Sequence, residues 1–281
     1  MGDLTIVRSV ADLRTQITAW RKQGKTIAFV PTMGALHEGH LSLIKLGHER
    51  ADKVCVSLFV NPKQFGPNED FEVYPRDEQA DIGQLEGVGT NLLYAPDVTE
   101  IYPDGHTTSL TVGPIADILE GECRPGFFTG VATVVSKLLL QVLPDIAIFG
   151  EKDFQQLQVI RKVVKDMDIP VDIVGGPTVR ERDGLALSSR NAYLSDEERA
   201  VASKLHHTLQ GIAKAVTENQ NIDTLLSVAV EELKASGFGD VDYLAVRDAT
   251  TLQAVTDLNK PNRVLVAATL GKTRLIDNIA I

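Results

Sequence analysis

Short apolar runs alternate with longer amphipathic segments over residues 9–174. The runs have the length and flanking turn residues of buried strands, and they cover residues 26–30, 54–60, 91–94, 146–149 and 171–174. The segments between them have helical periodicity, and they cover residues 9–23, 40–51, 78–86, 130–142 and 154–167. Strands separated by helices of about ten or more residues pair in parallel through crossover helices. Such a sheet binds ligands at the carboxyl ends of its strands.

The pattern changes after residues 175–177, Gly-Gly-Pro. Ser195 and Glu198 form a capping box that predicts one long helix to about residue 217, and a second helix is predicted at 222–235. Strands are then predicted at residues 241–246, 263–267 and 275–277. Helices grouped before strands indicate a smaller α+β domain, so we place the domain boundary near Pro177.

Composition and charge narrow the class of protein. The chain has 281 residues, 43% of them hydrophobic, which is enough for a sizeable core. A net charge of −10 argues against a non-specific nucleic-acid or membrane binder, although an acidic protein can hold a local basic pocket. Cys55 and Cys123 are too few for a disulfide framework and are not spaced for a metal site. With no visible secretory signal and no bilayer-length apolar segment, we expect a cytoplasmic protein.

The segment PTMGALHEGH joins the first predicted strand to the next helix. Gly34 and Gly39 let the backbone approach a ligand, and the helix start offers free N–H groups to an anion. His37 and His40 can point at one phosphate, to which imidazole donates better when protonated. The segment is not a Walker A loop, because Lys-Ser/Thr is missing, and its spacing is not that of the zinc motif HExxH. The alternative is a glycine-rich turn with two incidental histidines.

Two more polar clusters can contribute to a phosphate site. GEKD (residues 150–153) directly follows a predicted strand, and the charge of Lys152 suits a triphosphate. The alternative is a solvated turn in which Asp153 caps the next helix. LSSRN (residues 187–191) offers hydroxyl groups and a guanidinium to phosphate oxygens, and its alternative is an ordinary polar turn. Histidine, lysine and arginine from three segments together favour phosphate chemistry.

Two glutamines offer neutral amide groups to a ligand. Gln64 follows the strand predicted at 54–60, and Gln156 lies near the start of a predicted helix. An amide is a suitable donor to a hydroxy acid. Taken separately, each glutamine has the alternative of being a surface residue.

Eight segments carry a family resemblance: VPTMGALHEGH (30–40), VNPKQFGPNED (60–70), YPRD (74–77), EIYPDG (100–105), LEGECRPG (119–126), FGEKDFQQL (149–157), DGLALSSRNAYL (183–194) and RLIDN (274–278). Through them the chain resembles the pantothenate synthetase (pantoate–β-alanine ligase) family over nearly its whole length. HxGH alone is shared by many nucleotidyltransferases, whereas its combination with GEKDFQQL and LSSRN is specific to this family.

The resemblance implies a Rossmann-like domain over residues 1–177 that binds ATP and pantoate, a C-terminal α+β lid domain over residues 178–281, and a homodimer. It also implies a two-step reaction. The pantoate carboxylate attacks the α-phosphate of ATP, which gives pantoyl-adenylate and pyrophosphate. The amine of β-alanine then attacks the adenylate, which gives pantothenate and AMP.

The resemblance further implies roles for individual residues. Catalysis would depend on His40, which donates to the phosphate, and on His37, Lys152 and Arg190. Pantoate would be held by Gln64 and Gln156, and Mg²⁺ by Asp81. The residues expected to line the ATP site are Met33, Gly34, Ala35, Leu36, His37, Glu38, Gly39, His40, Gly150, Glu151, Lys152, Asp153, Val179, Leu187, Ser188, Ser189 and Arg190.

Departures and alternatives remain at this point. The family usually has other residues at Lys63, Asp77 and Phe127. Neither Phe127 nor Lys63 alters the motifs that define the reaction. One alternative function is another HxGH nucleotidyltransferase that transfers a whole nucleotide to a phosphorylated acceptor. A second is a non-catalytic protein. The net charge and the lack of a basic stripe disfavour an RNA-binding module, and the intact set of His37, His40, Lys152 and Arg190 disfavours a nucleotide sensor.

Overall fold

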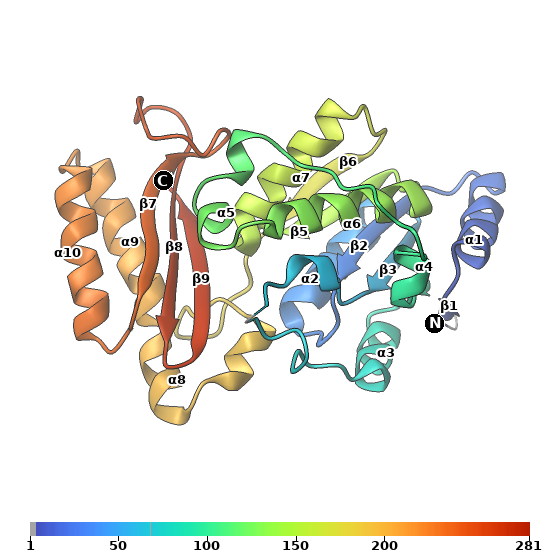
Figure 1. Cartoon of the computed structure of the whole chain (residues 1–281), viewed down its shortest axis with the longest axis horizontal. Coiled ribbons are helices and arrows are strands. Elements are labelled where there is room, and N and C mark those ends of the chain that lie inside the picture. The colour runs from blue at the N-terminus through green and yellow to red at the C-terminus, as the bar shows by residue number, and fades with distance from the viewer. Residues whose placement is uncertain (1–3, 68) are drawn as a thin grey trace.

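The computed structural model describes residues 4–67 and 69–281, which form two β-sheets (Figure 1). The first sheet is parallel, in the order β1-β4-β3-β2-β5-β6, with strands Thr5–Val7 (β1), Ile27–Thr32 (β2), Lys53–Leu58 (β3), Leu92–Tyr94 (β4), Ile146–Gly150 (β5) and Asp172–Gly176 (β6). The second is antiparallel, in the order β7-β8-β9, with strands Val241–Asp248 (β7), Asn262–Leu270 (β8) and Thr273–Ala280 (β9).

Helices cover both faces of the parallel sheet. Its main helices are Val10–Lys22 (α1), Glu38–Arg50 (α2), Glu78–Gly87 (α3), Phe127–Val142 (α6) and Phe154–Asp166 (α7), with single turns at Val98–Ile101 (α4) and Glu120–Cys123 (α5). Successive strand residues point to opposite faces, so Phe29 and Cys55 pack with α1, α6 and α7, whereas Ala28 and Val54 pack with α2 and α3. Within the described part of the chain, no helix is long and apolar enough to cross a membrane.

The strand order places a binding crevice near the centre of the parallel sheet. β2 pairs with β3 on one side and with β5 on the other, so the direction of winding reverses between β2 and β5. In an open parallel sheet, ligands bind outside the carboxyl ends of the strands at such a reversal. The turns after β2, β3 and β5 all open at this edge.

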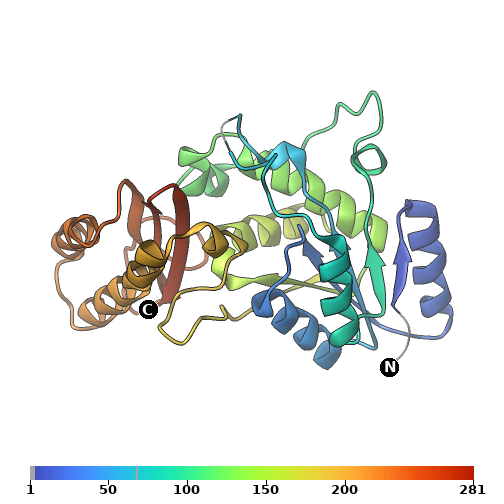
Figure 2. The same cartoon turned by 90° about the horizontal axis from the view of Figure 1, so that it is seen from below.

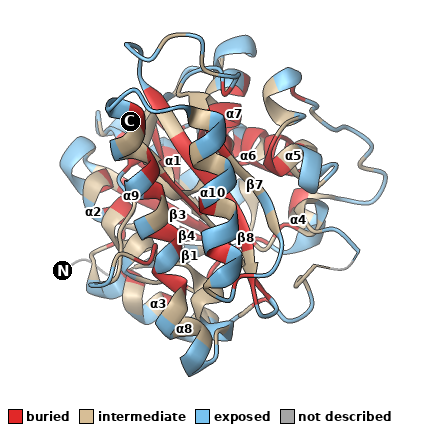
Figure 3. Ribbon diagram, turned by 90° about the vertical axis from the view of Figure 1, so that its left-hand side faces the viewer, coloured by how far each residue is buried: buried red, intermediate tan, exposed pale blue. Residues whose placement is uncertain are grey.

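The C-terminal part has its own layers. Asp196–Ala202 (α8), Lys204–Thr217 (α9) and Ile222–Ala235 (α10) share a buried core with β7, β8 and β9, and Figure 3 shows α9 and α10 in front of the sheet. This part lies to one side of the parallel sheet, opposite the N-terminus (Figure 2). The predicted fold class, a Rossmann-like α/β domain with a smaller α+β C-terminal domain, is confirmed. Ala245 and Leu265 also join the core of the parallel sheet, so the boundary at residue 177 stays a prediction.

Several predicted elements have other bounds in the structure, and among them the helix predicted at 130–142 begins at Phe127 and the strand predicted at 275–277 covers Thr273–Ala280. The helix predicted at 40–51 begins at Glu38, because His37 caps it. The single helix predicted to run to residue 217 is divided at Ser203, where φ −64° and ψ −17° tighten the turn toward 3₁₀ values. The strand predicted to stop at Pro31 continues to Thr32. β2 tolerates this proline because its pairing with β5 is confined to Ala28 and Phe29.

Candidate active site

A pocket of about 680 Å³ lies between the carboxyl ends of β2, β3 and β5 and the C-terminal sheet. It brings together most of the residues proposed from the sequence, namely Met33, His37, Gly39, His40, Gln64, Gly150, Lys152, Asp153, Gln156, Val179, Leu187, Ser188, Ser189 and Arg190. Six others do not line it, namely Gly34, Ala35, Leu36, Glu38, Asp81 and Glu151. Glu38 instead pairs with Lys45 at the surface, 2.6 Å away.

The two histidines are built into the start of α2. His37 is the N-cap residue, and its Nδ1 accepts the backbone N–H of Gly39 at 3.2 Å. The Nδ1 of His40 accepts the backbone N–H of His37 at 3.3 Å. The ring centroids are 4.1 Å apart. Because each Nδ1 accepts a hydrogen bond, each neutral ring carries its proton on Nε2.

Burial keeps both rings neutral. It is the main cause that lowers the pKa of His37 to about 4, and the charge of Lys152 adds to it. Burial, His37 and Lys152 together lower the pKa of His40 to about 3. The sequence suggested a protonated imidazole as the better donor to phosphate. In the structure, both residues are neutral Nε2–H donors at pH 7.

Asp81 supports the loop before α2 from behind. Its carboxylate accepts the backbone N–H groups of Ala35 at 3.0 Å and Leu36 at 2.7 Å, and the residue is only 3% exposed. These bonds hold Ala35 at a φ of 50°, in the left-handed region. Each carboxylate oxygen bonds one backbone N–H group, and Asp81 is not among the residues that line the pocket, so its role as a magnesium ligand stays a prediction. Among residues 4–67 and 69–281, no group of three or more His, Cys, Asp or Glu is arranged to hold a metal ion.

Lys152 comes from a 3₁₀ turn, Glu151–Asp153 (η3), that joins β5 to α7. Its side chain is 18% exposed, and its Nζ lies 3.8 Å from the Asp153 carboxylate. Its positive charge lowers the pKa of both histidine rings, so the turns after β5 and β2 share one electrostatic environment. Glu151 faces the other way and pairs with Arg263 at 3.3 Å.

Arg190 lies in a second 3₁₀ turn, Ser189–Tyr193 (η4). Its guanidinium donates two hydrogen bonds to the carboxylate of Asp70, at 2.9 and 2.8 Å. Burial alone would lower the pKa of Arg190, but the hydrogen bond and charge of Asp70 raise it, so the group stays charged. The hydroxyl of Ser189 donates to the Ala35 carbonyl at 3.1 Å, which joins this turn to the loop before α2.

Gln64 lies in the 3₁₀ turn Pro62–Gln64 (η1), after β3. Asn61, which is 1% exposed, donates from Nδ2 to the Gln64 Oε1 at 3.0 Å, and its own Oδ1 accepts the Tyr102 hydroxyl at 2.8 Å. The Gln64 amide nitrogen is thereby directed to the pocket side, where it contacts the Met33 sulfur at 2.9 Å. Asn61 and Tyr102 are orienting residues that sequence reasoning did not single out.

Gln155 and Gln156 both line this pocket, but the side-chain amide of Gln155 is used for structure. The Gln155 amide donates to the carbonyls of Ile115 and Ile118, at 2.9 and 2.7 Å, and its oxygen accepts the N–H of Glu120 at 3.0 Å. Of the two adjacent glutamines, only Gln156 is therefore available to a substrate.

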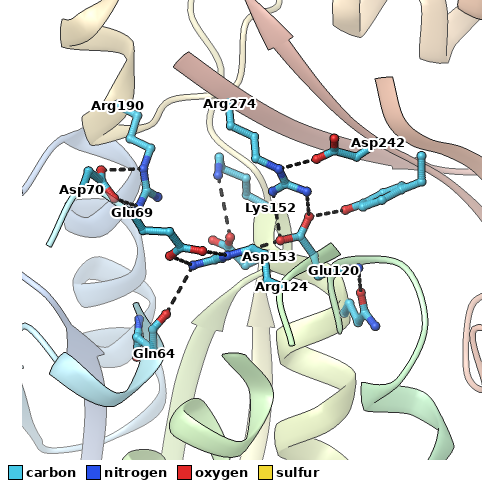
Figure 4. A network of polar contacts seen from close by, with 12 residues as sticks. Gln64, Glu69, Asp70, Glu120, Arg124, Lys152, Asp153, Arg190, Asp242 and Arg274 are labelled. Atoms are coloured by element: carbon cyan, nitrogen blue, oxygen red, sulfur yellow. Dashed lines mark hydrogen bonds and ion pairs between the residues drawn. The ribbon is translucent and has the colours of Figure 1, made fainter. Parts of the chain in front are cut away.

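A network of ion pairs crosses the pocket (Figure 4). Arg124 pairs with Glu69 at 2.5 Å and lies 3.6 Å from Glu120. Arg274 of β9 donates to Glu120 at 2.7 and 3.0 Å and to Asp242 at 2.6 Å. Most of these side chains belong to segments that carried the family resemblance, but the sequence alone assigned them no role. Charged residues on loops are usually solvated, so only the resemblance could have indicated that these residues belong to the site.

Comparison with known proteins identifies the family. The family model for pantoate-beta-alanine ligase matches residues 5–280. The chain belongs to the pantoate–β-alanine ligase family. A pantothenate synthetase of Rhodospirillum rubrum is 54% identical over 282 residues, which cover 100% of both proteins. That of Paramagnetospirillum magneticum is 57% identical over 276 residues, 98% of this chain and 97% of the relative.

Solved ligases of this family share the fold over 98% of this chain. The pantothenate synthetase of Thermus thermophilus superposes with a TM-score of 0.92 at 45% identity, over 98% of both chains. The pantoate-beta-alanine ligase of Francisella tularensis, solved with beta-gamma ATP and beta-alanine, gives a TM-score of 0.83 at 37% identity, over 98% of this chain and 97% of its own. This protein is accordingly a ligase that forms an amide bond.

Proposed function

We propose that this pocket joins pantoate to β-alanine in two steps, through pantoyl-adenylate. A carboxylate oxygen of pantoate attacks the α-phosphorus of ATP, the bond to the bridging oxygen breaks, and pyrophosphate leaves. The β-alanine amine then attacks the acyl carbon, the C–O bond of the mixed anhydride breaks, and AMP leaves while the nitrogen loses a proton. Adenylation is needed because a free carboxylate is a poor electrophile.

The observation that carries the proposal is that donors from three turns meet in one pocket. His37 and His40 offer neutral Nε2–H groups beside the start of α2, whose dipole also favours an anion. Lys152 and Arg190 add positive charge, which stabilises the negative charge that grows on the phosphate.

Gln64 and Gln156 line the same pocket, and we assign them to pantoate. The Gln64 amide can donate to a pantoate oxygen because Asn61 already occupies its Oε1. An enzyme that transfers a whole nucleotide to a phosphorylated acceptor would have no need of this amide pair. The pair therefore favours the ligase over the alternative nucleotidyltransferase.

Four further features are proposed, three of them from the family resemblance and the cytoplasmic location from the sequence pattern. ATP is expected with Mg²⁺ as the counter-ion of its triphosphate, but we assign Mg²⁺ no protein ligand and derive no step through it. We also propose a homodimer, a cytoplasmic location, and a C-terminal domain that acts as a lid over the pocket. A lid would shield the adenylate from water.

An isotope-transfer experiment tests the two-step reaction. The protein is incubated with ATP, Mg²⁺, β-alanine and D-pantoate labelled with ¹⁸O in its carboxylate. Adenylation places one labelled oxygen between carbon and phosphorus, and cleavage of the C–O bond leaves it in AMP. Labelled AMP formed in amounts equal to pantothenate is the expected result.

Other outcomes would overturn the proposal. ADP as the nucleotide product would indicate an acyl phosphate instead of an adenylate. Pyrophosphate release with a phosphorylated acceptor, and no turnover with pantoate, would indicate the alternative nucleotidyltransferase.

A further inference from the structure

Asn278 reaches from the C-terminal sheet to the turn that carries Lys152. It lies on β9 and is 3% exposed. Its side-chain Nδ2 donates to the backbone carbonyls of Glu151 at 3.0 Å and of Lys152 at 2.8 Å. Both N–H groups of one amide are therefore used on consecutive carbonyls of η3. This contact spans 126 residues of sequence and joins the two sheets.

Asn278 is itself held in place. Its Oδ1 accepts the guanidinium of Arg263 at 2.5 Å, and its backbone N–H donates to the Asp277 carboxylate at 2.7 Å. That carboxylate also accepts two hydrogen bonds from Arg180, at 2.6 and 2.9 Å. The guanidinium of Arg263 also lies 3.7 Å over the ring of Phe154, the first residue of α7. The turn before α7 is thus held from the C-terminal sheet at several points.

We propose that Asn278 is a positioning residue for Lys152. A three-residue 3₁₀ turn has few internal bonds, so external partners for its carbonyls decide where the lysine backbone lies. Through Asn278, the placement of the Lys152 ammonium against the α-phosphate depends on the C-terminal sheet. This inference rests on the phosphate-binding role proposed for Lys152.

Asn262 provides a matched control. It lies on the neighbouring strand β8 and is 2% exposed. Its Nδ2 likewise donates to two backbone carbonyls, those of Asp257 at 3.3 Å and Lys260 at 2.7 Å. These carbonyls belong to the loop between β7 and β8, which does not line the pocket. Asn262→Asp therefore removes the same kind of bonds from an equally buried residue without touching Lys152.

The test compares single-turnover adenylation in Asn278→Asp and Asn262→Asp, with the melting temperature of each variant. Aspartate has the same shape but no N–H group to donate. We expect Asn278→Asp to slow adenylation roughly 10- to 100-fold, as expected when a catalytic group is displaced by about 1 Å. Asn262→Asp should stay within about 3-fold of the parent. Equal slowing in both variants would overturn the proposal. If Asn278→Asp does not fold, Asn278→Ser, which retains one donor, replaces it.

A double-mutant cycle with Lys152→Ala separates positioning from general damage. If Asn278 acts through Lys152, adding Asn278→Asp to Lys152→Ala should slow adenylation less than about 3-fold further. If the two substitutions together slow adenylation by the product of their separate factors, the inference is overturned. The single variant Lys152→Ala tests the proposed function on its own. If it adenylates at the parent rate, the role of Lys152 fails, whatever Asn278 does.

Discussion

His40 uses its two ring nitrogens for different tasks. Nδ1 accepts the N–H of His37 and so completes the cap of α2, while Nε2–H is left for the pocket that the ring lines. Because burial lowers the pKa of this ring to about 3, the donor is neutral at pH 7. A neutral donor stabilises negative charge on a phosphate without having to gain a proton first.

Two substitutions of His40 separate these tasks. The amide nitrogen of glutamine lies near the position of Nε2, whereas the asparagine amide reaches only as far as Nδ1. We expect His40→Asn to lose about 10²- to 10³-fold in the rate of adenylation and His40→Gln to lose less, as measured by rapid quench. The parent rate should show no acid limb near pH 6.5, the ordinary pKa of histidine. Such a limb in the parent that His40→Gln abolishes would mean that imidazolium is the donor.

The same histidines should make the fold sensitive to acid. Their pKa values are about 4 and about 3 in the fold but near 6.5 in the unfolded chain. Between these values the unfolded chain binds more protons, so the free energy of unfolding falls as pH falls below about 6.5. The slope is at most about 1.4 kcal/mol per pH unit for each ring. Urea titrations at pH 7 and pH 5 should show a smaller loss for His37→Gln/His40→Gln than for the parent.

At the scale of elements, the contact between α6 and η1 places Gln64. A Cβ on Gly130 of α6 would lie 2.1 Å from the Lys63 carbonyl oxygen, so only glycine allows this approach. The Gly130 carbonyl also accepts the Asn61 amide at 3.2 Å. One helix thus supports both the backbone and the side chains of the turn that faces pantoate.

Gly130→Ala should therefore affect pantoate more than ATP. We expect KM for pantoate to rise by roughly 10-fold or more because η1 must move, while KM for ATP changes little. Steady-state kinetics with each substrate varied will measure this. Gly211→Ala on α9 is the control, because its Cβ meets nothing within 4 Å and should stabilise the helix by about 0.5–1 kcal/mol. Equal changes in both KM values for Gly130→Ala would contradict the prediction.

Elements with a regular apolar pattern and an ordinary capping residue were predictable from the sequence, and elements without them were not. Ile222–Ala235 appears with the predicted bounds because asparagine caps it and its apolar spacing is regular. β1 was missed, since three residues at a sheet edge carry no periodic pattern. The start of α2 was placed too late because a histidine, an uncommon N-cap, does the capping. The three turns of the site were found because each follows a strand or a loop with recognisable phosphate-binding residues.

At the scale of the whole molecule, Arg274 ties the two sheets together. It extends from β9 to Glu120 on α5, which is 154 residues away in sequence, and to Asp242 on β7. The Glu120 side chain is 7% exposed and that of Arg274 is 27% exposed, so the pair is largely shielded from water. Tyr243 also donates to Glu120, at 2.8 Å.

Removing Arg274 should loosen the C-terminal sheet. Arg274→Ala leaves Glu120 with weaker compensation, and we expect a loss of about 2 kcal/mol in unfolding free energy. Amides of β7 and β8 should also exchange faster with deuterium, while those of β2 and β3 change less. Lys162→Ala removes an exposed pair with Asp166 and should cost less than about 1 kcal/mol. If Arg274→Ala speeds exchange equally in both sheets, the prediction is contradicted.

Ion pairs between residues so far apart in the sequence could not be predicted from the sequence alone. Arg190 meets Asp70 across 120 residues, and nothing in local pattern says which carboxylate a given arginine will face. The backbone partners of Asp81 could not be predicted for the same reason, because they lie on the loop after β2, 45 and 46 residues away. Pattern and resemblance predicted which turns form the site, whereas the partners of each charge required the folded chain.

The pairing of Arg190 with Asp70 has a consequence for ligand affinity. A nucleotide phosphate that takes this arginine must displace a carboxylate, so binding is an exchange between two anions. The measured affinity for ATP therefore reflects the attraction between Arg190 and the phosphate minus the free energy needed to separate Arg190 from Asp70. A compound designed against this site gains by leaving the pair intact, or by offering Asp70 a cation of its own.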